Sequence, residues 1–278
     1  MSQRALHVWL PVGGMIAAAW LFLGVMAIDL ARVVSAGALG PGMSIFEAAV
    51  NNLSLSLGNL CRPLTEAELA SGAIGPMLRV VVMWLAMSIA MMLPTAVPLI
   101  ATYVDFSFAN PERVPQRQVY ALIAGYLIVW FGFSVSAAAL QIGLSRALVL
   151  DGAMVGRLGW VSAAFLVIAG AYQFSALKAS CLARCRAPFA TFLGMWRDGL
   201  RGALIMGLKQ GGYCLGCCWA LMLLAFVGGV MNVLWMAAAM ALMLVEKLPS
   251  AGERLTQGIG ILLIAAGAFV AVSTALSA

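Results

Sequence analysis

Five of the six cysteines gather in two short stretches of the C-terminal half. Cys181 and Cys185 are four residues apart, and Cys214 is three and four residues from Cys217 and Cys218. On helices, these spacings place the thiols of each stretch on one face. Thiolates are soft ligands that favour Cu(I), and four of them would also suit Zn(II). The two stretches therefore predict a soft-metal site, although a membrane helix can also use cysteine as a small packing residue.

Methionine is the second soft donor in the chain, which contains seventeen of them. Met91 and Met92 lie at the depth expected for the thiols, so they are candidate thioether ligands of the same ion. Flexible packing in an apolar core is the favoured explanation of these methionines, and thioether ligation is the alternative that stays open. His7 is the single histidine, which excludes a His-rich metal site and a Ser–His–Asp triad.

The composition indicates where these residues are held. Hydrophobic residues make up 64% of the 278 residues and charged residues only 9%, whereas soluble domains carry about 25% charged residues. The chain is therefore predicted to be all-α, a single integral membrane domain over 1–278 that forms a polytopic helical bundle in the lipid bilayer. The net charge of +6 comes from basic residues that bunch in one loop, which indicates topology and not nucleic-acid binding.

Apolar runs predict about seven membrane spans, or six if the span at 210–227 is partly re-entrant. Gly228 and Gly229 form a tight turn that would make the two flanking helices antiparallel neighbours. Pro94 and Pro98 are expected to kink or end the second span. The seven expected spans are 8–28, 79–101, 119–144, 160–177, 210–227, 230–245 and 258–276.

Two intervals between spans carry the topology. Residues 31–78 are expected to form an extracytoplasmic loop with an interfacial helix or a helix packed on the bundle, and Cys61 in this loop is expected to be an isolated packing residue. Residues 178–209 form the most basic loop, which places this loop and the N-terminus in the cytoplasm. With a span starting near 210, the thiols of 214–218 would lie roughly 6–12 Å from the helix start.

Several segments of the second half resemble a family of bacterial integral membrane proteins described as predicted metal-binding, some of them labelled copper chaperones. The resemblance implies a location in the bacterial cytoplasmic (inner) membrane and a role in copper handling. It rests on A-M-S-I-A-M-M-L-P-T-A-V-P at 86–98, C-L-A-R-C-R-A-P at 181–188, G-Y-C-L-G-C-C-W-A-L-M at 212–222, G-V-M-N-V-L-W-M at 229–236 and E-K-L at 246–248.

Three functions are compatible with these features. The first is a metal-handling membrane protein that binds Cu(I) and delivers it to a protein partner or metal acceptor. The second is a thiol–disulfide oxidoreductase using Cys214-Leu-Gly-Cys217, which the cytoplasmic placement disfavours because stable disulfide exchange belongs to oxidising compartments. The third is a structural subunit or assembly factor of a membrane complex. An enzymatic role is the less favoured interpretation.

Overall fold

The computed structural model describes residues 3–34, 42–46, 74–109, 116–147, 159–248 and 252–277, and within these ranges the chain is helical and contains no strand. The all-α prediction is confirmed. The helices are α1 (Gln3–Val34), η2 (Met43–Phe46), α4 (Ile74–Ala109), α5 (Gln116–Arg146), α6 (Gly159–Tyr172), α7 (Ala176–Arg186), α8 (Pro188–Met195), α9 (Gly199–Met222), α10 (Ala225–Gly228), α11 (Val233–Lys247) and α12 (Glu253–Ser277).

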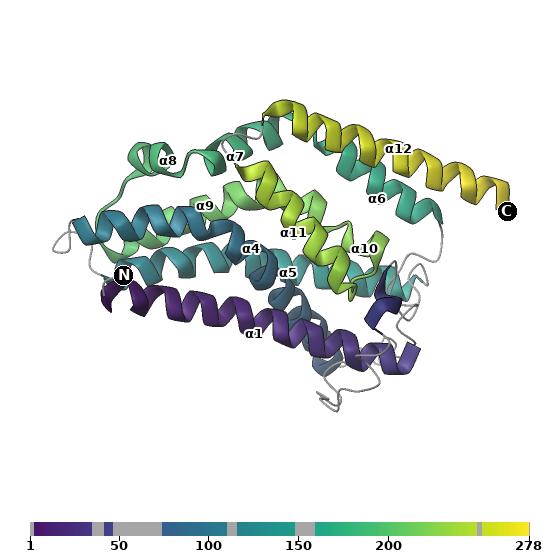
Figure 1. Ribbon diagram of the computed structural model, residues 1–278, viewed down its shortest axis with the longest axis horizontal. Helices are drawn as coiled ribbons and strands as arrows, with labels where there is room; N and C mark the ends of the chain where they lie inside the picture. Colours follow the sequence, from purple (N-terminus) through teal and green to yellow (C-terminus); the bar gives the residue numbers. More distant parts are fainter. Residues whose placement is uncertain are drawn as a thin grey trace.

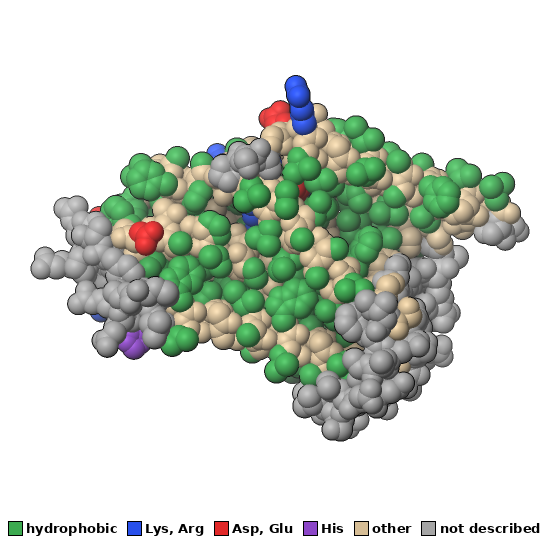
Figure 2. All heavy atoms as spheres, viewed as in Figure 1, with side chains coloured by type: hydrophobic (Ala, Val, Ile, Leu, Met, Phe, Trp, Pro, Cys, Tyr) green, Lys and Arg blue, Asp and Glu red, His purple; other side chains and the backbone are tan. Residues whose placement is uncertain are grey.

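Five stretches of the described chain are long and apolar enough to cross a membrane. The protein is therefore a membrane protein. On the face drawn in Figure 2, hydrophobic side chains are spread over the described surface with few charged groups between them. Counting α6 and α7 as one span bent by 65° raises the number to six. The stretches are His7–Ala31, Ile74–Phe106, Gln116–Arg146, Gly199–Gly228 and Glu253–Leu276.

The predicted total of about seven spans is close to this count, and the difference arises around α7 and α11. α11 has 15 residues and is therefore about 22 Å long, shorter than the roughly 30 Å of a hydrocarbon core. The segment 178–209, expected to be a loop, instead forms α7, α8 and the first turns of α9. Most of 31–78, with its expected interfacial helix and Cys61, lies outside the described residues.

The long helices run roughly along the longest axis of the molecule (Figure 1). α5 packs most extensively on α9, and α6 pairs with α12 at the side of the bundle. The α5–α9 contact depends on glycine: a Cβ at Gly207 would collide with the Leu122 carbonyl, and one at Gly125 with the Leu204 carbonyl. Small residues let two backbones approach closely, as is common between membrane helices.

α4 continues through Pro94 and Pro98 to Ala109, so the expectation that these prolines could end the span is wrong. Pro94 has no N–H to donate to the Ala90 carbonyl four residues earlier. The Trp20 indole of α1 donates to that carbonyl at 3.0 Å and replaces the missing bond. A neighbouring helix thus satisfies the backbone that proline leaves unpaired, which allows the helix to continue in an apolar environment.

The turn predicted at Gly228 and Gly229 is present between α10 and α11. Gly229 has φ +96°, a conformation that residues with a Cβ rarely adopt. Asn232 then caps α11, because its side chain accepts a hydrogen bond from the Trp235 backbone N–H at 2.9 Å. This turn brings α11 back toward α4, α7 and α9, where its C-terminal end contributes to the candidate site.

Candidate metal centre

One face of α9 carries three buried thiols, those of Cys214, Cys217 and Cys218. Their side chains are at most 2% exposed, and their three sulfur atoms all lie within 4.8 Å of one another. The Sγ atoms of Cys217 and Cys218 are 3.2 Å apart. Because α9 begins at Gly199 and not near 210, Cys214 lies about 22 Å from the helix start instead of the expected 6–12 Å.

Cys185 adds a fourth thiol from α7. Its Sγ lies 3.9 Å from Cys217 Sγ, and the Gln210 amide donates to it at 4.0 Å. The expectation that the two cysteine stretches meet in space therefore holds for Cys185. We call Cys185, Cys214, Cys217 and Cys218 the thiol cluster. A metal–sulfur bond of about 2.3 Å requires sulfur atoms roughly 4 Å apart, and these separations are compatible with that requirement.

Cys181 lies outside the thiol cluster. It is buried against Gly216, which faces away from Cys214 on α9, and it lines a different cavity with Tyr172 and Trp219. The spacing of four residues does put Cys181 and Cys185 on the same side of α7. Among the described thiols, Cys185 contacts Cys217 at 3.9 Å, whereas Cys181 makes no such contact with the cysteines of α9. Its predicted role as a ligand has no support in this geometry.

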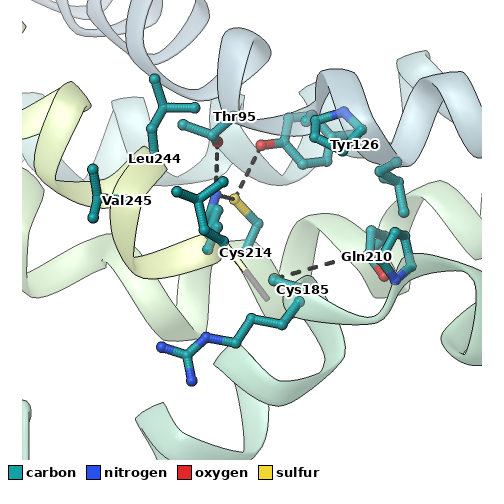
Figure 3. A pocket seen from close by; sticks show the side chains of 14 residues that line it. Thr95, Tyr126, Cys185, Gln210, Cys214, Leu244 and Val245 are labelled. Atoms are coloured by element: carbon teal, nitrogen blue, oxygen red, sulfur yellow. Dashed lines mark hydrogen bonds between the residues drawn. The ribbon is translucent and has the colours of Figure 1, made fainter. Parts of the chain in front are cut away.

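Polar groups from three other helices surround Cys214 (Figure 3). The Tyr126 hydroxyl of α5 lies 3.0 Å from Cys214 Sγ, and the Lys247 ammonium of α11 donates to the same sulfur at 3.1 Å. Lys247 also donates to the Thr95 hydroxyl of α4 at 2.6 Å. A positive charge and a hydroxyl therefore face the Cys214 sulfur, as expected around a thiolate ligand.

Met91 and Met92 are both buried on α4. The structure links Met92 to the site through its backbone, because the Met92 carbonyl accepts from Thr95 at 2.9 Å and from Tyr126 at 3.0 Å. These bonds place α4 beside the thiol cluster and use the carbonyl oxygen, not the thioether. Ligation by either thioether stays a prediction.

A buried ion pair holds α7 against the end of α11. Lys178 and Glu246 are each 1% exposed or less, and Lys178 Nζ lies 2.8 and 3.1 Å from the two Glu246 carboxylate oxygens. The Arg186 Nε donates to the Glu246 carbonyl at 2.8 Å. Since Cys185 precedes Arg186 and Lys247 follows Glu246, these contacts fix the position of Cys185 relative to the ammonium that meets Cys214.

A cavity of about 250 Å³ leads to the thiol cluster (Figure 3). Cys185 and Cys214 form part of its wall together with Gln210 and Lys247, while apolar side chains such as Leu244 and Val245 line the remainder. The side-chain oxygen of Gln210, Oε1, is buried without a hydrogen-bond partner among the described residues. The sulfur atoms are thus accessible from a preformed space, although Cys214 itself is only 2% exposed.

The donors that meet here are chemically uniform. Among the described residues, the three thiols of α9 are the only group of His, Cys, Asp or Glu side chains close enough to hold a metal ion. The set contains no imidazole or carboxylate, and thiolates alone favour soft ions. A soft metal ion therefore fits these residues, with two or three sulfur ligands from α9 and Cys185 within 3.9 Å of one of them.

The model of a protein family described as "PpoB2: Copper chaperone" matches residues 81–270, more than half of the chain. The protein belongs to this copper chaperone family. No curated protein and no solved structure gives a significant match. The family match extends from α4 into α12 and so includes every helix that contributes to the thiol cluster and its surroundings. α1 lies before it.

The sequence analysis did not identify the polar side chains that surround the thiol cluster of this copper chaperone family member. Tyr126 and Thr95 lie singly within apolar runs far from the cysteines in sequence, whereas Gln210 is four residues before Cys214 and could have been found from that spacing. Lys247 belongs to the E-K-L segment, where Glu246 is its neighbour of opposite charge in sequence. The structure instead pairs Glu246 with Lys178 and directs Lys247 to Cys214.

Proposed function

We propose that this protein is a membrane copper chaperone that holds one Cu(I) ion in the thiol cluster and transfers it to an acceptor protein. The observation that carries the proposal is the approach of Cys185 of α7 to Cys217 of α9, with sulfur atoms 3.9 Å apart, beside an accessible cavity. Cys217 Sγ lies 3.2 Å from Cys218 Sγ on the same helix. Membership of a copper chaperone family supports copper as the cargo.

Charge also favours Cu(I) over Zn(II). Zinc held by four thiolates leaves two net negative charges, whereas Cu(I) held by two thiolates leaves only one. Buried net charge is costly unless a partner compensates it, and the Lys247 ammonium at 3.1 Å from Cys214 Sγ supplies one positive charge. The site therefore suits low-coordinate Cu(I), and zinc is the competing cargo.

Transfer requires one ligand that an incoming thiolate can replace. Cys185 suits this role, because it is half-buried, lines the cavity and comes from α7, while the other three thiols share the rigid α9. An acceptor thiolate entering the cavity would bind copper as the Cys185 sulfur leaves, and the proton lost by the acceptor would pass to Cys185. Copper keeps its oxidation state, so no reductant is needed.

For location, we infer the bacterial inner membrane, with the N-terminus and the Cys181–Cys185 helix at the cytoplasmic face. The excess of lysine and arginine in 178–209 supports this orientation. A membrane-impermeant maleimide applied to intact cells should leave Cys181 and Cys185 unlabelled. Rapid labelling from outside would reverse the orientation and favour the oxidoreductase function.

The decisive experiment is a Cu(I) titration of purified protein in detergent under reducing conditions, in competition with a chromophoric Cu(I) chelator. Wild-type protein should bind one equivalent, with sulfur as the nearest scatterer in X-ray absorption. Cys217→Ser and Cys185→Ser should weaken binding by more than the roughly 10–100-fold that loss of an outer-shell partner costs. Cys181→Ser is the matched control, because it removes a thiol one turn away on α7 and should preserve affinity.

Each alternative function makes a different prediction for this titration. A structural subunit or assembly factor would bind no copper in the wild type. Equal losses in Cys181→Ser and Cys185→Ser would contradict the thiol cluster as the single site. An oxidoreductase would accumulate a disulfide under mild oxidation, and the copper chaperone would not.

A further inference from the structure

A second cavity, of about 290 Å³, lies where the turn between α6 and α7 meets the first turns of α12. Its wall contains residues from the end of α6, one side of α7 and the start of α12, and it contains none of the cysteines of the thiol cluster. The polar residues of the wall are Gln173, Ser175, Arg186, Glu253, Thr256 and Gln257.

Four buried polar atoms in this wall have no hydrogen-bond partner in the described part of the chain. They are Nε2 and Oε1 of Gln173, Oγ1 of Thr256 and Nη2 of Arg186. Gln173 is 4% exposed and Thr256 is 7% exposed. Most buried side-chain polar atoms in native proteins are paired, so four unpaired atoms around one cavity indicate a missing polar ligand.

The packing of α12 on α6 creates this arrangement. A Cβ at Gly260 would lie 2.9 Å from Gln173 Cβ and 2.7 Å from Phe174, so only glycine permits α12 to approach this closely. The close approach brings the first turns of α12 beside Ser175, which caps α7. The N-terminal ends of two helices, of 11 and 25 residues, therefore border the cavity, and such ends favour negative charge.

The charged groups indicate the chemistry of the ligand. Arg186 lines both this cavity and the one beside the thiol cluster. Its Nε donates to the Glu246 carbonyl, and its buried Nη2 has no hydrogen-bond partner in the described part of the chain. Glu253 is exposed at the rim. Donors for an anionic group line the wall at Arg186, Gln173 and Thr256, and Glu253 at the rim offers a partner for an ammonium group. Arginine and amide donors with helix N-termini are typical of phosphate recognition.

We infer that this cavity binds a phosphate ester, and that a phosphate ester carrying an ammonium group fits it best. Such a group is available as a phospholipid headgroup or as a free phosphate compound. The cavity borders the start of Glu253–Leu276, one of the stretches long and apolar enough to cross a membrane, and lipid headgroups surround the ends of such stretches. The inference does not depend on copper binding.

The test uses delipidated, metal-free, full-length protein in detergent. Short-chain phosphatidylethanolamine, phosphoethanolamine and inorganic phosphate are titrated separately and followed by native mass spectrometry. Arg186→Gln and Thr256→Val should each weaken binding about tenfold, the effect of losing a charged or well-buried hydrogen bond. Arg184→Gln is the matched control, because Arg184 is exposed on the same helix, does not line the cavity and carries the same charge.

The three probes separate the sources. Binding of the lipid alone, or of the lipid and the free phosphates, supports the inference when both variants weaken it and Arg184→Gln does not. Failure of all three probes to bind wild-type protein would overturn it and leave water as the occupant. Equal weakening by Arg184→Gln would also overturn it, as nonspecific charge attraction. Unchanged Cu(I) stoichiometry in Thr256→Val would show that this variant is folded. If wild-type protein bound no copper, the phosphate result would still stand, because this cavity contains none of the cysteines of the thiol cluster.

Discussion

The buried Lys178–Glu246 pair should be essential for stability as a pair but dispensable when both partners are replaced. Lys178→Met keeps most of the side-chain volume and removes the ammonium, which leaves the Glu246 carboxylate buried at 1% exposure without its partner. Breaking a buried ion pair in this way costs about 3–5 kcal/mol, whereas replacing both ions by apolar side chains is often neutral. We therefore expect Lys178→Met to be strongly destabilising and Lys178→Met/Glu246→Leu to recover most of the loss.

The size of the effect can be converted into a melting shift. For a protein of about this length, each kcal/mol changes the melting temperature by roughly 2–4 °C, so Lys178→Met should lower it by roughly 6–20 °C. The measurement is thermal unfolding in one detergent at a fixed heating rate, because membrane proteins often unfold irreversibly. Copper affinity should follow the same order, since the pair fixes α7 and Cys185 relative to Lys247.

Two results would refute this reasoning. A loss of less than about 2 °C in Lys178→Met would show that the carboxylate finds another partner or becomes protonated at little cost. A double variant as unstable as Lys178→Met would show that packing, and not the unpaired charge, causes the loss. Lys209→Met is a suitable control. It makes the same substitution at an exposed lysine of α9, where no buried carboxylate is left unpaired, so it should have little effect.

Two further predictions concern the surroundings of the site and the helix contact beneath it. Tyr126→Phe and Lys247→Met should each lower Cu(I) affinity by about 10–100-fold, measured by chelator competition, because each removes a partner of Cys214; unchanged affinity in both would contradict that role. Gly207→Ala should destabilise the protein by about 1–3 kcal/mol in thermal unfolding, because the new methyl group collides with the α5 backbone. Gly212→Ala, with open space around its Cβ, should have little effect.

Much of the fold follows from composition. A chain with 64% hydrophobic and 9% charged residues can satisfy its backbone in lipid only as helices, and long apolar runs locate most of the spans. The positions at which helices begin and end are predicted less well from composition. The start of α9 at Gly199 was missed because Arg201 and Lys209 interrupt its apolar pattern. The continuation of α4 through Pro94 depends on an indole supplied by α1, which no local pattern reports.

Part of the candidate site likewise follows from the sequence, and part depends on the tertiary structure. The sequence by itself determined that three thiols share one face of α9, because residues three and four apart on a helix are neighbours whatever surrounds them. Only the tertiary structure decided that Cys185 and not Cys181 approaches them, since that depends on how α7 lies across α9. It also decided that Lys247 meets Cys214 while Glu246 pairs with Lys178. Adjacent residues on a helix point in different directions, and only the packing of α11 determines which neighbour each one meets.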